Sequence, residues 1–162
     1  MADIRTLAER QAIGREARSR AKRSSNAEIG NTDRDPVALL EQNSAGRVEA
    51  LVPLRYGRMS VSPFTFFRGS AILQAHDLAA TANAGIAFPI CGDAHLMNFG
   101  GFATPERQLV FDLNDFDEVA VGPWEWDVKR LAGSLAIAGE HMGIARDTVS
   151  DIVATAVHEY RD

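Results

Sequence analysis

The chain has 162 residues, a net charge of −5 and a single cysteine, with 46% hydrophobic and 24% charged side chains. This length and composition fit one soluble globular domain, or one lobe of a larger domain, and argue against a disordered chain. No apolar run approaches the roughly 18 residues that span a bilayer, no secretory signal is present, and Cys91 cannot form an internal disulfide, so we expect a cytoplasmic protein without a membrane partner.

The first 23 residues differ in charge from the rest of the chain. They hold seven basic and three acidic side chains, a local charge of +4, so the remainder carries −9. We therefore expect residues 1–34 to form a basic leader that is helical or partly disordered. Such a leader could contact nucleic acid, but the acidic body argues against that partner and favours a solvated arm.

Helix signals and one aromatic run follow the leader. Asp35, with Pro36 after it, predicts the start of a short helix, because aspartate caps helices and proline suits their first position. The aromatic run at 64–67 has a composition that favours a strand. Ser70 is a candidate cap for the helix that comes next.

Two short apolar segments, residues 86–91 and 109–111, flank a polar loop rich in glycine. We expect two strands with a functional loop between them. The remaining sequence predicts one helix over about 124–142 and another that begins at Thr148, because their apolar residues recur at helical spacing. The apolar stripe of the last helix needs a partner, which predicts self-association through that helix.

The polar loop contains the sequence GDAHLMN, in which Asp93 and Asn98 stand in the order D-x-x-x-x-N. This is the spacing of the protein-kinase catalytic loop, where the aspartate accepts a hydroxyl proton and the asparagine holds Mg²⁺. An amide oxygen is a hard, neutral ligand that suits Mg²⁺. The spacing predicts Asp93 as a catalytic residue, with His95 orienting the loop beside it, and Asn98 as a metal ligand.

An acidic segment follows the second apolar run. Between Asp112 and Asp127 six side chains are acidic and none is basic. Carboxylates gathered in this way repel one another unless they are solvated or bound to cations. Asp112, directly after the predicted strand, is the first candidate for a metal ligand, and Asp115 and Asp117 remain alternatives.

Two further side chains complete the predicted site. Asp127 lies at the start of a predicted helix, where its charge favours the helix dipole and its oxygens could accept hydrogen bonds from the Asp93 loop. Phosphate groups need lysine or arginine, and Arg68 is our first choice for that cofactor-binding role, ahead of Arg55 and Arg58. The sequence has no G-x-G-x-x-G motif, so it does not define a nucleotide pocket.

Four segments resemble the uncharacterised bacterial family known as domain of unknown function 2252, over about residues 35–142. They are RYGRMSVSPFTFFRG, CGDAHLMNFG, FDLNDFDE and GPWEWDVKRLAGSL. The same loops are more distantly similar to the aminoglycoside phosphotransferase and choline kinase group of the protein-kinase-like superfamily. This resemblance implies an α+β, partial kinase-like fold with a small mixed sheet, a catalytic loop between short strands and helices at the C-terminal end.

The resemblance also implies roles for individual residues. Asp93 would be the catalytic aspartate, His95 the second histidine of the motif, Asn98 and Asp112 the metal ligands, and Asp127 the helix aspartate that braces the loop. The domain would span residues 35–162 and transfer phosphate from ATP, with Mg²⁺, to a small acceptor. Relatives of this family are longer, so we expect the chain to be an incomplete, N-terminal fragment of such a protein.

Two alternative functions remain open. A non-catalytic binding module with a degenerate kinase fold is the first, because the glycine-rich loop and the strand lysine of a kinase are missing. A metallophosphoesterase-like hydrolase is the second, because G-D-x-H also begins such sites. Those sites need further histidines, and the helical surroundings of His76, His141 and His158 contain no matching motif.

Overall fold

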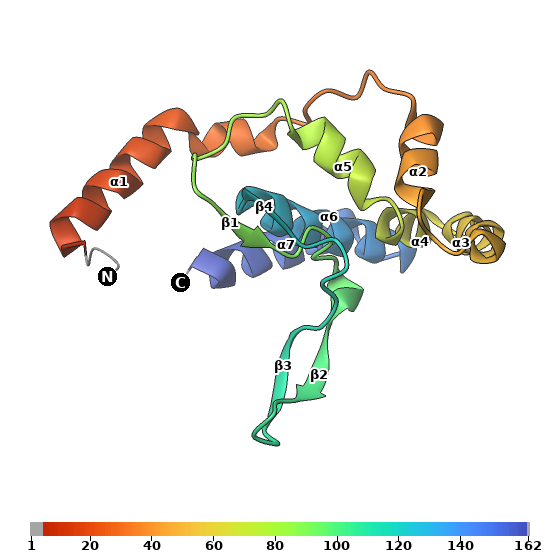
Figure 1. Cartoon of the computed structure of the whole chain (residues 1–162). Coiled ribbons are helices and arrows are strands. Elements are labelled where there is room, and N and C mark those ends of the chain that lie inside the picture. Colours follow the sequence, from red (N-terminus) through yellow and green to blue (C-terminus); the bar gives the residue numbers. More distant parts are fainter. Residues whose placement is uncertain (1–4, 162) are drawn as a thin grey trace.

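The computed structural model describes residues 5–161, and residues 1–4 of the leader and Asp162 lie outside the described residues. Within them, helices and short strands make a mixed α+β fold (Figure 1), which confirms the predicted class. The α-helices are Leu7–Arg20 (α1), Pro36–Ser44 (α2), Val52–Met59 (α3), Pro63–Arg68 (α4), Ala71–Leu78 (α5), Glu125–His141 (α6) and Arg146–Arg161 (α7). The strands are Ala87–Ile90 (β1), Phe99–Ala103 (β2), Leu109–Leu113 (β3) and Ala120–Pro123 (β4). Short 3₁₀-helices cover Arg23–Ala27 (η1), Glu49–Leu51 (η2) and Leu96–Asn98 (η3).

The four strands form two separate antiparallel pairs, which corrects the prediction of one small mixed sheet. β1 pairs with β4, with Ile90 opposite Ala120, and β2 pairs with β3, with Phe99 opposite Leu113. Parallel neighbours need a crossover of a dozen or more residues, and only residues 104–108 connect β2 to β3. Because β1 leads into the polar loop and β4 leads into α6, their pairing brings the loop to the start of α6.

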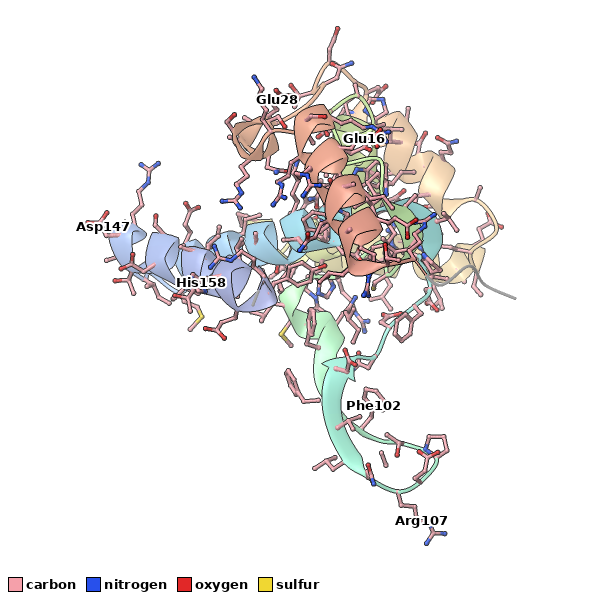
Figure 2. The ribbon with its side chains drawn as sticks, turned by 90° about the vertical axis from the view of Figure 1, so that its left-hand side faces the viewer. Glu16, Glu28, Phe102, Arg107, Asp147 and His158 are labelled. Atoms are coloured by element: carbon pink, nitrogen blue, oxygen red, sulfur yellow. The ribbon has the colours of Figure 1, made fainter. Side chains whose placement is uncertain are left out.

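The β2–β3 hairpin stands away from the helical body (Figure 1). Figure 2 shows Arg107 at the tip of the hairpin and Phe102 partway along it, both clear of the helices. Leu109 and Phe111 on β3 are 83% and 76% exposed. The hairpin therefore adds little to the core, and its base leads directly into the acidic segment after β3.

Residues 63–68 form helix α4, although their aromatic composition predicts a strand. The Ser62 hydroxyl accepts a hydrogen bond from the Thr65 N–H at 3.1 Å, and the Thr65 hydroxyl accepts one from the Ser62 N–H at 2.9 Å. Pro63 occupies the first helical position, where no N–H is needed. These start signals outweigh the strand propensity, because that propensity depends strongly on context.

The other predicted helices are present with small shifts at their ends. The Asp35 cap is confirmed, since its side chain accepts hydrogen bonds from the first turn of α2. Ser70 precedes α5 but makes no capping hydrogen bond through its side chain. The last helix begins at Arg146, so Thr148 lies inside its first turn and is not its cap.

A small hydrophobic core joins α2, α3 and α5. Leu40, Met59 and Leu73 are buried and pack together. Gly69 passes so near to this core that a Cβ added to it would lie 2.6 Å from Cγ of Met59. Only glycine lets the α4–α5 turn approach at this distance, and the same turn contributes to the candidate site described below.

The C-terminal end of the leader is attached to α5. Arg34 donates a hydrogen bond to Asp77 at 2.8 Å, and the Asn31 N–H donates to the Asp77 carbonyl at 3.1 Å. Ala17 on α1 is buried.

None of the helices within residues 5–161 has both the length and the apolar character that a membrane span requires.

The last two helices lie along each other (Figure 1). Val149 on α7 is buried against Gly139 on α6, where an added Cβ would lie 2.6 Å from Cγ2 of Val149. Tyr160 stacks on Trp124 with 5.9 Å between the ring centroids. Part of the α7 stripe therefore has a partner inside the chain. Ile152, Val157 and Tyr160 remain 39%, 43% and 57% exposed, and self-association through this helix stays a prediction.

Replacing Gly139 by alanine should lower the free energy of unfolding. The new Cβ would overlap Val149, whose branched side chain has little freedom to move. Overpacking of this kind costs about 1–3 kcal/mol, more than the roughly 0.5–1 kcal/mol that alanine adds inside a helix. We expect Tm to fall by roughly 2–4 °C per kcal/mol, measured by calorimetry.

Gly14→Ala in α1 is the matched control, because nothing lies within 4 Å of a Cβ at that position. Its Tm should equal or exceed that of the wild type. A Gly139→Ala variant as stable as Gly14→Ala would show that α6 and α7 do not approach each other this closely.

Candidate functional site

A buried arginine on α6 holds the polar loop that follows β1. Arg130 is 2% exposed, and its Nε donates a hydrogen bond to Oδ1 of Asp93 at 2.7 Å. Its other nitrogens donate to Oε1 of Gln74 at 3.2 Å and to the carbonyl of Phe67. The guanidinium group also lies over the Phe67 ring, 3.9 Å from the centroid. Arg130 thus joins α4, α5 and α6 to the loop.

The second carboxylate oxygen of Asp93 is left for other contacts. Oδ2 lies 3.8 Å from Nε2 of His95, which is too far for a hydrogen bond. Nδ1 of His95 accepts a hydrogen bond from the Met97 N–H at 3.2 Å, so the neutral ring carries its proton on Nε2. Burial lowers the pKa of His95, so the ring near Asp93 is neutral at pH 7.

Two side chains of α6 hold the backbone of the loop. The Asp127 carboxylate accepts hydrogen bonds from the N–H groups of Cys91 at 2.7 Å and Gly92 at 3.0 Å. Oγ of Ser134 accepts a hydrogen bond from the Leu96 N–H at 2.9 Å. Because hydrogen bonds to a charged acceptor are the stronger ones, Asp127 is the main anchor of the loop.

Gly92 lets the acidic segment reach the loop. Its φ is +81°, and a Cβ at this position would lie 2.2 Å from the carbonyl oxygen of Glu118. Beside it, Sγ of Cys91 donates a hydrogen bond to the carbonyl of Asp115 at 3.1 Å. Burial raises the pKa of Cys91, which keeps the thiol protonated and able to donate. These contacts bring residues 115–118 close to Asp93.

A pocket of about 150 Å³ lies beside Asp93. Its lining combines guanidinium groups from the α2–α4 region with carboxylates from the loop and the acidic segment. The charged residues of the lining are Arg47, Arg55, Arg68, Asp93, Asp115, Asp117 and Glu118. The lining contains no aromatic or large apolar side chain among the described residues. The pocket therefore suits a small ligand that carries charges of both signs.

Arg55 is the most constrained of the three pocket arginines. Its Nη2 donates hydrogen bonds to Oδ1 of Asn43 at 2.9 Å and to the Gly69 carbonyl at 2.6 Å. Its Nη1 is buried and has no hydrogen-bond partner among the described residues. Burial and then the positive charge of Arg47 lower the pKa of Arg55. An anion in the pocket would offset both effects.

The structure brings some of the site residues that the sequence predicts to the pocket and places others elsewhere. Asp93 and Arg68 line the same pocket, and His95 is buried next to Asp93. Asn98 is 8% exposed, and its Nδ2 donates to the Asp93 carbonyl at 2.8 Å, so this side chain holds the loop. Asp112 is exposed on β3, where its carboxylate accepts a hydrogen bond from the next N–H, and it does not line the pocket.

A closed metal centre is absent from the described part of the chain. No three histidine, cysteine, aspartate or glutamate side chains within residues 5–161 converge so that they could hold an ion. Asp115 and Asp117 do line the pocket, whereas Asp112 does not.

Sequence reasoning misses several residues of this site. Arg130 and Ser134 stand three and seven residues after Asp127, so a polar stripe runs along α6 beside its apolar stripe. That spacing was a readable sign of one polar helix face turned toward the loop. Arg47 carries no comparable sign, because its place in the pocket depends on contacts between segments far apart in the sequence.

The fold and the pocket define an α+β domain with a buried arginine–aspartate pair beside a small pocket of mixed charge. The profile of a family described as "Uncharacterized protein conserved in bacteria (DUF2252)" matches residues 47–162. The match covers most of the chain, so the chain belongs to this family, and the resemblance seen in the sequence is confirmed at that level. Neither a curated protein nor a solved structure matches the chain.

Asp127→Ala should loosen the loop and destabilise the protein. The variant leaves the N–H groups of Cys91 and Gly92 without their acceptor, and a hydrogen bond to a charged group contributes about 1.5–3 kcal/mol. Urea unfolding should show that loss, and hydrogen exchange should be faster at these two amides. Asp151→Ala on the exposed face of α7 is the control and should stay within about 0.5 kcal/mol of wild type. Unchanged exchange at both amides would contradict the anchoring role.

Stability should decrease when the pH falls below about 6.5, in part through His95. Its pKa in the folded protein is lowered by burial, so between the folded and unfolded values the unfolded chain binds more protons. The stabilisation that His95 contributes is fully present above its pKa in the unfolded chain. It is lost as the pH falls through its pKa in the folded protein.

The measurement compares urea midpoints at about pH 7.5 and about pH 5, on either side of the unfolded pKa. His95→Gln should show a smaller decrease between the two conditions than the wild type. The exposed His141→Gln is the control for replacing a histidine outside the site. An equal decrease in wild type and His95→Gln would mean that His95 does not titrate differently on folding.

Proposed function

We propose that this chain carries a phosphoryl-transfer site in which Asp93 is the base for an acceptor hydroxyl. The observation that carries the proposal is a single pocket lined by Asp93 and by three arginines, Arg47, Arg55 and Arg68. Arginine suits phosphate because it is always charged and presents paired N–H donors. The donor in this proposal is ATP with Mg²⁺, and the acceptor is a small molecule with a hydroxyl or amine group.

The proposed step is a displacement at the terminal phosphorus of the donor. The acceptor oxygen bonds to phosphorus while the bond from phosphorus to the ADP oxygen breaks, and ADP keeps that electron pair. The acceptor proton passes to Oδ2 of Asp93, the oxygen that Arg130 does not bind. Since Arg130 fixes the carboxylate before substrate binds, orientation is the main contribution of this base.

In this proposal Mg²⁺ enters with the donor as part of the substrate. No step is assigned to a resident ion, because residues 5–161 contain no preformed metal centre. Asp115 and Asp117 line the pocket and offer the carboxylate oxygens that Mg²⁺ prefers, so we propose them for this contact in place of Asp112. Asn98 acts on the backbone of the loop and supports the position of Asp93.

A distant relationship to protein-kinase-like enzymes is part of the proposal. The order of loop aspartate, loop asparagine, acidic segment and helix aspartate supports it. The region before the loop departs from a kinase small lobe, because residues 5–86 form helices without a strand and no lysine lies between Lys22 and Lys129. The pocket arginines would replace that lysine as the cations that meet the phosphates.

A non-catalytic binding module is the second candidate. The observation that favours it is the bond from Arg130 to Asp93, which occupies one oxygen of the proposed base. The two candidates differ in one outcome, because both predict binding of Mg-ATP and only the first predicts transfer.

The test measures transfer of labelled phosphate from Mg-ATP to a panel of small alcohols, sugars and amines. Wild-type protein should label at least one acceptor. Asp93→Asn should lower kcat by roughly 10²–10⁴-fold and leave KM for Mg-ATP nearly unchanged. Arg68 is exposed, so Arg68→Gln should fold normally and raise KM by about tenfold through loss of a charged hydrogen bond.

Controls are an exposed carboxylate and an exposed arginine outside the pocket, Asp151→Asn and Arg58→Gln, which should keep wild-type rates. Circular dichroism and Tm would establish that Asp93→Asn is folded. Wild-type kcat in folded Asp93→Asn would reject Asp93 as the base. Binding of Mg-ATP without transfer to any acceptor would reject the transferase and favour the binding module.

A further inference from the structure

We infer that the site recognises its donor through the phosphate chain alone, so that inorganic triphosphate with Mg²⁺ binds as well as Mg-ATP. The inference rests on the proposed function and narrows it to one substrate class, the magnesium complexes of phosphate chains. The size of the pocket, the chemistry of its lining and the arrangement of its charges each support it.

The pocket is too small to enclose a nucleotide. Its volume is about 150 Å³, whereas pockets that enclose a drug-sized ligand have roughly 300–1,000 Å³. A space of this size accepts phosphate groups, and the ribose and base of a bound nucleotide would project beyond it. Groups that stay in water add little to affinity, so removing them should change binding little.

The lining offers no surface for a purine ring. Bases bind on aromatic side chains or apolar walls, and the uncharged lining residues among those described are Asn43, Gly69 and Ala71. The Phe67 ring is nearby, but Arg130 already lies over it, 3.9 Å from its centroid. Hydrogen bonds and ion pairs are therefore the interactions that the pocket can supply.

The charges of the pocket match a metal–phosphate complex better than either ion alone. Three guanidinium groups can bind phosphate oxygens, and Nη1 of Arg55 still has no hydrogen-bond partner among the described residues. Asp115 and Asp117 can face the cation. A bare phosphate chain would be repelled by these carboxylates, and a bare cation by the arginines. Arg47 and Glu118 already pair at 3.1 Å, which keeps part of this charge balanced before ligand binds.

The experiment is isothermal titration calorimetry of the full chain with sodium triphosphate, ATP and adenosine, each with and without MgCl₂. We expect Kd values for Mg-triphosphate and Mg-ATP within about threefold of each other, a difference of less than about 0.7 kcal/mol. Adenosine should not bind, and omitting Mg²⁺ should weaken triphosphate binding by about tenfold or more. Arg68→Gln should weaken both complexes equally, by about tenfold, and Arg58→Gln should weaken neither.

Binding of Mg-ATP more than about thirtyfold tighter than Mg-triphosphate, roughly 2 kcal/mol, would overturn the inference, because the nucleoside would then contribute. Binding of adenosine alone, or no binding of Mg-triphosphate, would overturn it as well. These results are separate from those for phosphoryl transfer. Triphosphate binding without transfer would reject the proposed function alone, whereas transfer from Mg-ATP with no affinity for Mg-triphosphate would reject this inference alone.

Discussion

The ion pair between Arg130 and Asp93 is the constraint on which the rest of the site depends. Arg130 is 2% exposed, and a buried charge left without its partner costs about 3–5 kcal/mol. Its guanidinium group has fixed donor directions, so the positions of Asp93, Gln74 and the Phe67 carbonyl are set together. Arg130 on α6 therefore fixes the relative positions of α4, α5 and the loop that carries Asp93.

The site forms where two glycines allow segments to approach more closely than other residues could. Gly69 lets the α4–α5 turn pass Met59, and Gly92 lets the acidic segment reach the Asp93 loop. As a result, arginines from the region before β1 and carboxylates from the segments after it line one small space. The β2–β3 hairpin stands outside this arrangement, and its acidic residue Asp112 remains exposed there.

A pocket in which cations and carboxylates stand together selects ligands by their charge distribution. Each charge alone would attract many small ions, but the combination favours a ligand that carries a chain of anions and a bound cation. The arginines also occupy carboxylates that could otherwise bind an ion. Arg130 binds one oxygen of Asp93, and Glu118 pairs with Arg47. No group of side chains within the described residues is therefore arranged to hold an ion.

The sequence by itself determined the features that depend on neighbouring residues. The cap of α2 at Asp35, the two strands around the polar loop, the helix of α6 and the D-x-x-x-x-N motif can all be read from neighbouring residues, because caps, periodicity and motif spacing are local. The strand expected at 64–67 was wrong, since the capping pair around Pro63 outweighed composition. Only the tertiary structure decided that Arg130 would bind Asp93, that Arg47 would reach the pocket, and that Asp115 and Asp117 rather than Asp112 would line it. Those placements depend on long-range packing and on the close approaches at Gly69 and Gly92. Local spacing could indicate only that Arg130 lies on a polar face of α6, and not which residues that face would bind.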